Sequence, residues 1–86
     1  MAPGMERVNE PMANAFARVL REMRQSVGMT QEDLAERANV SARFVSFLET
    51  GKRQPTLSAV AALSAGLGTT MSTMMTRVEQ QMKIRA

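Results

Sequence analysis

The 86-residue sequence contains no cysteine, histidine, tryptophan or tyrosine. Without cysteine and histidine it lacks the usual zinc ligands, a thiol nucleophile and a histidine-based catalytic centre. No convergent acid, base and nucleophile predicts an enzyme, so we expect no catalytic activity, no metal and no cofactor. No apolar run reaches membrane-spanning length, and the N-terminus lacks the apolar segment of a signal peptide. We therefore expect a cytoplasmic protein with no membrane partner.

Charge is also missing from part of the chain, because residues 54–76 contain no charged side chain. Basic residues gather before and after this segment, and the net charge is +3. A positive balance is compatible with a nucleic-acid partner but is not specific to one. The length suffices for one small domain, and a partner subunit can add to the stability of such a domain.

Two short helices joined by a tight turn are predicted in the middle of the chain. Thr30 is a good N-cap for the first helix, and Asn39 tolerates the left-handed conformation that ends helices. The apolar residues between them share one helical face: Leu34, Ala35 and Ala38. Ser41 is the next N-cap, and the second helix covers about residues 42–50 before Gly51 ends it.

The second helix is expected to have two different faces. At about 100° per residue, Val45 and Leu48 point inward. The opposite face carries small, polar, basic and aromatic side chains: Ala42, Arg43, Ser46, Phe47 and Thr50. This layout is typical of a helix-turn-helix, whose second helix lies in the major groove of DNA.

Four residues of the second helix are candidates for contacts to base edges. Arg43 can donate two hydrogen bonds to the O6 and N7 atoms of a guanine. Ala42 and Phe47 can contact thymine methyl groups, and Ser46 can bond a base or a phosphate. Two alternatives stay open at this point: Phe47 also suits a core or a protein interface, and Arg43 also suits a solvated surface charge.

Four further residues are candidates for contacts to DNA phosphates. Gln31 begins the first helix of the pair, where a side chain and the helix N-terminus can hold one phosphate together. Thr50 can bond a base or a phosphate, and Lys52 and Arg53 follow in a loop close to the expected path of the DNA backbone. The alternatives are a neutral helix-start residue and a solvated loop pair.

The same residues resemble the phage repressor, Cro and XRE-type family of helix-turn-helix regulators over about residues 14–75. The matching positions have fixed spacing: Thr30-Gln31-Glu32-Asp33-Leu34-Ala35, Val40-Ser41, Val45, Leu48-Glu49, Gly51-Lys52 and Pro55. The resemblance implies an all-α, five-helix, lambda-repressor-like domain that binds specific DNA sequences as a dimer. It implies a phosphate contact for Gln31 and base contacts for Ala42, Arg43 and Phe47. The family more often has polar or basic residues where Ala42 and Phe47 stand, which leaves Arg43 as the main specific reader.

The resemblance also pairs Arg24 with Glu49. Glu49 lies between the core and the solvent on the helical wheel, and a buried acid needs a partner. An arginine on the first helix of the chain can supply it. We therefore predict an ion pair with a structural role.

The remaining segments complete the predicted domain, which covers residues 13–76 and follows a flexible tail of residues 1–12. Pro3, Gly4 and Pro11 indicate the tail. The first helix, at about residues 13–26, has a predicted core stripe of Phe16, Val19, Leu20, Met23 and Val27. A fourth helix, capped by Thr56, has a predicted inner face of Leu57, Val60, Ala61 and Leu63.

The last helix is predicted to extend beyond the domain, over residues 77–86, and to form a dimer. Exposed apolar surface usually marks an interface, and methionine suits an adaptable one. The expected dimer contacts share one helical stripe: Met71, Met74, Met75, Val78 and Met82. The alternative is that the whole stripe packs inside the chain.

The predicted function is transcriptional control by a homodimer on double-stranded DNA. Each second helix would enter the major groove at one half of a pseudo-palindromic operator, with half-sites ~34 Å apart. The output would be occlusion of a promoter or contact with RNA polymerase beside it. The alternative is an antitoxin-like interaction module whose methionine-rich last helix binds a different protein.

Overall fold

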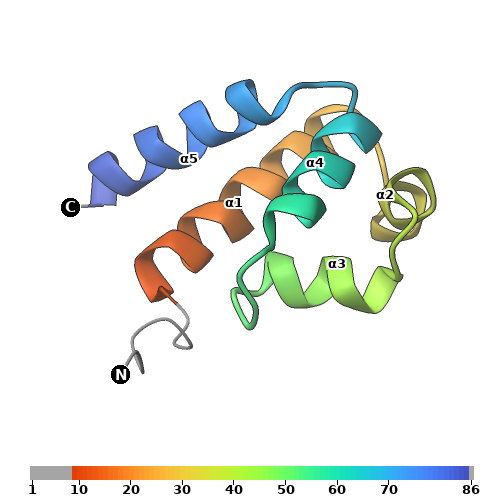
Figure 1. Cartoon of the computed structure of the whole chain (residues 1–86), viewed down its shortest axis with the longest axis horizontal. Coiled ribbons are helices and arrows are strands. Elements are labelled where there is room, and N and C mark those ends of the chain that lie inside the picture. Colours follow the sequence, from red (N-terminus) through yellow and green to blue (C-terminus); the bar gives the residue numbers. More distant parts are fainter. Residues whose placement is uncertain (1–8, 86) are drawn as a thin grey trace.

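The chain folds into helices only, as predicted, over the part that the structure describes. The computed structural model describes residues 9–85, with side chains for 9–83. Its elements are α1 (Glu10–Ser26), α2 (Gln31–Ala38), α3 (Ala42–Glu49), α4 (Leu57–Gly66) and α5 (Met71–Arg85), shown in Figure 1. None of these five helices combines the length and apolar character needed to cross a membrane.

Helix α1 begins at Glu10, inside the segment predicted to be a tail. The Asn9 side chain caps the helix by accepting a hydrogen bond from the Met12 N–H at 3.2 Å. Pro11 lies in the first turn, where a missing N–H costs no intrahelical hydrogen bond. The prediction assigned this proline to the flexible tail, although it suits a helix start. Residues 1–8 of the predicted tail lie outside the described residues.

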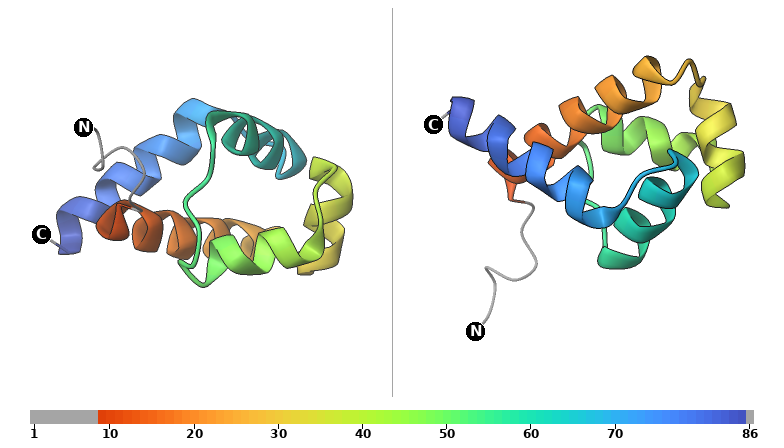
Figure 2. Two further views of the ribbon diagram at one scale, coloured as in Figure 1. Left: turned by 60° about the horizontal axis from the view of Figure 1, so that its bottom comes forward. Right: turned by 90° about the horizontal axis from the view of Figure 1, so that it is seen from above.

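The five helices enclose one apolar core. Helix α1 packs against α3 and α5, and α2 packs against α3 and α4, so α1 lies between the last helix and the helix-turn-helix (Figure 2). The largest fully buried apolar side chains come from all five helices: Phe16, Leu20, Leu34, Leu48, Leu63 and Met74. Gly66 permits a close approach of α4 to α2, since an added Cβ would lie 3.2 Å from Leu34 Cδ1.

Three residues predicted to be in the core are exposed. Val27 is 51% exposed because it is the C-cap of α1, where the helical spacing no longer applies. Leu57 is 78% exposed at the first position of α4, and Ala61 is exposed on its outer side. Helix α4 is apolar nearly all round, so its sequence pattern did not define an inner face.

The methionine-rich stripe of α5 packs inside the chain. Met74 is 0% exposed and Val78 is 3% exposed. Met71, Met75 and Met82 are half-buried and pack against the same core. Met74 and Val78 are therefore wrong as dimer contacts, because they have no surface left for a second subunit. The predicted boundary at residue 77 also falls inside α5, next to this core.

Candidate nucleic-acid interface

A three-residue turn sets the angle between α2 and α3. Asn39 has the left-handed conformation predicted for it, with φ 58° and ψ 45°. The next N–H, of Val40, donates to the Ala35 carbonyl at 3.0 Å. The Ser41 hydroxyl then caps α3 by accepting from the Phe44 N–H at 3.0 Å. These local bonds direct α3 across α2, as a helix-turn-helix requires.

The N-terminus of α2 is closed by a reciprocal cap. The Thr30 hydroxyl accepts from the Asp33 N–H at 3.0 Å, and the Asp33 carboxylate accepts from the Thr30 N–H at 3.0 Å. The bond from the Thr30 N–H, assisted by the Thr30 hydroxyl, lowers the pKa of the Asp33 carboxyl. This arrangement fixes the start of α2 and leaves its first turn facing solvent.

Side chains from three helices meet at Glu49, which is only 2% exposed. We call Arg21, Arg24, Gln31 and Glu49 the buried cluster after this buried acid, with Arg21 at its exposed edge. Arg24 donates from Nε to Glu49 Oε2 at 2.6 Å and from Nη2 to Oε1 at 2.9 Å. Arg21 donates to the Glu49 backbone carbonyl at 2.7 Å. The predicted ion pair is therefore present, and its hydrogen bond raises the pKa of Arg24 despite the opposing effect of burial.

Gln31 has a contact that the sequence pattern did not predict. Its Nε2 donates to Glu49 Oε1 at 3.0 Å, so the side chain is held between the start of α2 and the end of α3. An amide has two hydrogens on this nitrogen, and the N–H groups of the first helical turn have no partner within the helix. The second amide hydrogen and the backbone N–H of Gln31 are thus available to an acceptor outside the helix.

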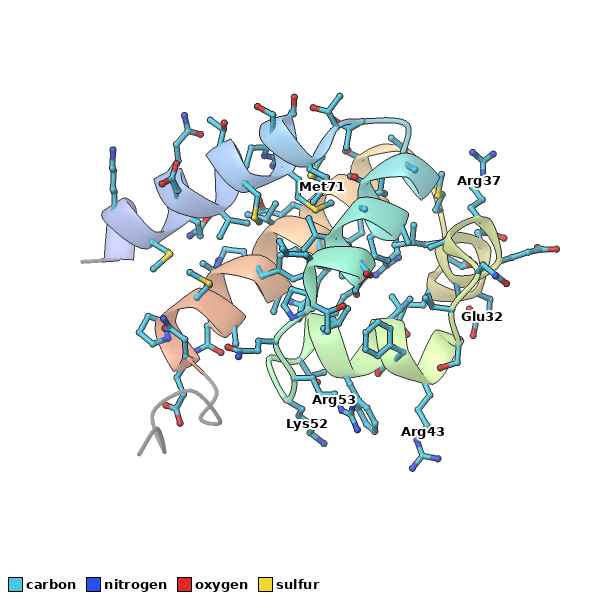
Figure 3. The ribbon with its side chains drawn as sticks, viewed as in Figure 1. Glu32, Arg37, Arg43, Lys52, Arg53 and Met71 are labelled. Carbon is cyan, nitrogen blue, oxygen red and sulfur yellow. The ribbon has the colours of Figure 1, made fainter. Side chains whose placement is uncertain are left out.

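The outer face of α3 carries the predicted base-contacting residues. Arg43 is exposed and points away from the helices in Figure 3. Ser46 and Phe47 are half-buried, and Ala42 is half-buried against the edge of the core. The structure therefore brings all four predicted side chains to one helix, with Arg43 extending furthest into solvent.

Two arginines cover the ring of Phe47. The Cζ atoms of Arg43 and Arg53 lie 5.5 Å and 5.9 Å from the ring centroid, within the range of cation–π contacts. We call Arg43, Phe47 and Arg53 the exposed cluster. Phe44 packs against the apolar core, whereas Phe47 is outside it. Phe44, Ser41 and the exposed cluster line a surface hollow of about 220 Å³.

The loop after α3 is attached to α1 at two points. Gly51 has φ +75°, and an added Cβ would lie 2.6 Å from the Asn14 side-chain oxygen, so glycine is strongly favoured there. The Gln54 side-chain oxygen accepts from the Asn9 N–H at 2.9 Å. Lys52 and Arg53 are exposed between these attachments and extend on the same side as Arg43 (Figure 3).

Thr50 is exposed at the end of α3, but its hydroxyl is directed back to the helix. Its Oγ1 donates to the carbonyl of Ser46 at 3.0 Å and to that of Phe47 at 3.2 Å. A hydroxyl has one hydrogen to donate. The geometry therefore does not favour the predicted phosphate contact of Thr50, since donation to DNA would break these bonds.

A short helix with a polar and aromatic outer face, held across a second helix and flanked by basic residues, defines a DNA-binding helix-turn-helix. The model of the helix-turn-helix family matches residues 20–73, more than half of the chain. The chain belongs to this family of DNA-binding transcriptional regulators, and its predicted XRE-type membership is confirmed.

Individual relatives agree with this assignment. An uncharacterized HTH-type transcriptional regulator of Methanothermobacter thermautotrophicus is 38% identical over 50 residues, 58% of this chain and 72% of that protein. The clp gene regulator ClgR of Corynebacterium glutamicum has a TM-score of 0.81 at 26% identity, over 86% of this chain and 79% of that one. The restriction-modification controller protein C.Esp1396I, solved as a tetramer with its 35 base-pair operator, has a TM-score of 0.77 at 24% identity. The match covers 83% of this chain and 93% of that one, and it shows a similar fold.

Proposed function

We propose that the protein regulates transcription by binding a pseudo-palindromic operator as a homodimer, with α3 in the major groove. The observation that supports the proposal is that the start of α2, the outer face of α3 and the loop after α3 carry polar and basic side chains beside one another. Arg43, Ser46, Phe47 and the methyl of Ala42 would contact bases. Gln31, Lys52 and Arg53 would contact phosphates.

The arrangement of these side chains supports a single docking direction. The Gln31 side chain bonds Glu49 at the C-terminal end of α3, and Lys52 and Arg53 follow the same end in the chain. Phosphate contacts from the start of α2 and from the loop after α3 would hold this end of α3 at the DNA backbone, while Arg43, nearer the other end, would read the bases. Bound at a promoter in the cytoplasm, the protein would exclude RNA polymerase or contact it beside the operator.

Selection of bound sites from random duplex DNA tests this function directly. We expect enrichment of a pseudo-palindrome with half-sites one helical turn apart, and a guanine in each half-site. The selection should be run at 50 mM and 200 mM salt, because non-specific binding weakens steeply with salt. Failure to enrich any sequence at either salt would overturn the proposal of sequence-specific binding.

The homodimer is supported by symmetry, because one short helix reads few base pairs and two-fold pairing doubles them. The three half-buried methionines, Met71, Met75 and Met82, keep part of their surface exposed for the contact. Truncation at residue 77 is a poor test, since it removes the core residue Val78. Substitution at a half-exposed position is better.

We expect the intact chain to sediment as a dimer and Met75→Lys to shift it towards monomer. Thr76→Lys is the matched control, since it adds the same charge at an adjacent exposed position of α5. Circular dichroism of each variant verifies that the monomer is folded. A folded Met75→Lys protein that remains a dimer would place the interface away from Met75.

The alternative of an antitoxin-like module rested on a free methionine stripe on the last helix. Met74 and Val78 are buried in the core of the same chain, and the surface left on Met71, Met75 and Met82 does not favour a different protein over a second copy of this chain. Stable co-purification with a different protein is the result that would restore it.

A further inference from the structure

Phe47 is half-buried without being part of the apolar core. The ring lies outside the apolar core, while the other aromatic residue of α3, Phe44, packs against that core. The groups over the Phe47 ring are the guanidinium groups of Arg43 and Arg53, at 5.5 Å and 5.9 Å. The ring is thus held on the outer face of α3 by two cations rather than by core packing.

The position of the ring relative to Arg43 limits what it can contact in DNA. Phe47 follows Arg43 by four residues, one helical turn and ~6 Å along α3. Successive bases on one strand are about 3.4 Å apart. If Arg43 bonds the O6 and N7 of a guanine, the Phe47 ring therefore meets a base pair one or two steps away. The apolar group in the major groove at such a step is the 5-methyl group of a pyrimidine.

We infer that Phe47 reads a pyrimidine 5-methyl group beside the guanine bound by Arg43, and so distinguishes methylated from unmethylated bases. Thymine and 5-methylcytosine carry this methyl group, whereas uracil and cytosine lack it. Where the operator has a cytosine at that step, cytosine-5 methylation then strengthens binding. The inference rests on the proposed operator binding and identifies a chemical feature that the same site recognises.

The cations over the ring strengthen this assignment. The Arg53 guanidinium can bind a phosphate while it stays near the ring, so the ring keeps one neighbour after Arg43 turns towards its guanine. Ala42, the other candidate for a methyl contact, packs against the edge of the core, and Ser46 has no comparable apolar surface. Within α3, Phe47 is thus the side chain best suited to the methyl group, with Arg53 as its positioning residue.

Pairs of DNA duplexes that differ by one methyl group, one pair for each tested position and base, test the inference. The preferred operator is prepared with thymine or uracil, and with cytosine or 5-methylcytosine, at each pyrimidine within two base pairs of the selected guanine. At one of these positions we expect the methyl group to tighten binding about fourfold, which corresponds to the burial of one methyl-sized group (~0.8 kcal/mol). Dissociation constants are measured at one fixed salt concentration.

The protein variants show whether Phe47 is the reader. In Phe47→Ala the ratio between methylated and unmethylated DNA should fall to about one, and in Phe47→Leu it should be intermediate. Lys52→Ala is the control, because it should weaken both duplexes equally and preserve the ratio. Thermal melting of each variant by circular dichroism verifies folding.

The outcomes separate this inference from the proposed function. If an operator is selected but no methyl group changes the affinity, or if Phe47→Ala keeps the fourfold ratio, the methyl-reading role is wrong while operator binding stands. If no operator is selected at all, the proposed function fails and the inference fails with it.

Discussion

The buried cluster and the exposed cluster lie on different sides of α3, and both are rich in arginine. In the buried cluster both arginines donate to Glu49 at 2.6–2.9 Å. Arg24 donates to its carboxylate, and Arg21 donates to its backbone carbonyl. In the exposed cluster the arginines have an aromatic ring as their neighbour, at 5.5 Å and 5.9 Å. The arginines of the buried cluster donate to acceptors within the chain, whereas those of the exposed cluster keep their guanidinium donors for an external partner.

This difference explains how α3, a helix of eight residues, has both a structural and a binding role. A buried charge is tolerated only when its hydrogen bonds are satisfied, and no buried side-chain nitrogen or oxygen among the described residues lacks a partner. A charge that contacts DNA must instead keep its donors free. Substitution of Glu49 in the first cluster should therefore affect stability, and substitution of Arg43 in the second should affect DNA binding, while Gln31, which adjoins both the buried acid and the proposed phosphate, should affect both.

The largest effect is expected for Glu49→Ala in the buried cluster. This change leaves Arg24 without its carboxylate and Gln31 without its acceptor, which costs roughly 3–5 kcal/mol for a buried pair. In a domain of this size the melting temperature should fall by roughly 12–40 °C. Thermal unfolding by circular dichroism measures the shift. Glu49→Gln, which keeps the shape and a side-chain oxygen, should be less affected.

A different result for Glu49 would remove the contrast between the two clusters. An unchanged melting temperature together with lost DNA binding would give Glu49 a direct part in the DNA interface. If Glu49→Gln alone lost DNA binding at an unchanged melting temperature, the negative charge of Glu49, rather than its hydrogen bonds, would be responsible.

The next effect is expected for Arg43→Ala in the exposed cluster. Loss of a bidentate guanine contact should weaken operator binding by roughly 5–150-fold, or about 1–3 kcal/mol, and relax the preference for that guanine. The melting temperature should stay nearly constant, because Arg43 is exposed. Arg43→Lys keeps the charge without the planar fork and should recover affinity more than specificity. Unchanged affinity and specificity would exclude Arg43 as a base reader.

A smaller effect is expected for Lys52→Ala, which removes a phosphate contact. Binding should weaken for all sequences alike, and the slope of log affinity against log salt should fall by about one. Lys83→Ala is the matched control, since it removes the same charge from an exposed position on α5. Electrophoretic or fluorescence titrations at several salt concentrations measure the slope. Equal slopes for both variants would place Lys52 away from the DNA backbone.

The sequence predicted the local parts of this site well. Caps are formed by side chains within three residues of the backbone that they bond, so Thr30 and Ser41 could be assigned from spacing alone. Asn39 and Gly51 were predicted for the same reason, because left-handed positions favour these residue types. Local chemistry therefore placed both helices of the motif correctly.

Contacts between distant residues were predicted less well. The Gln31–Glu49 bond joins residues 18 positions apart, and the Arg53 contact with Phe47 crosses a loop. Both depend on the angle between elements, which helical periodicity does not contain. The α5 methionines show the same difficulty, since Met74 has the pattern of an interface residue but lies in the core. Tertiary packing decides these cases.

The smallest predicted effect concerns Asp33, which lies at the start of α2 and belongs to neither cluster. Its folded pKa is lowered, chiefly by the hydrogen bond from the Thr30 N–H. The stability it contributes is therefore fully present above the pKa of an unfolded aspartate, about 3.9, and is lost as the pH falls through the lower folded value. Asp33→Asn should melt slightly below the unchanged protein at pH 7, and the difference should disappear under acid conditions. Melting curves between pH 7 and pH 2.5 measure it, and a difference that persists at the lowest pH would assign the effect to packing rather than to the carboxylate charge.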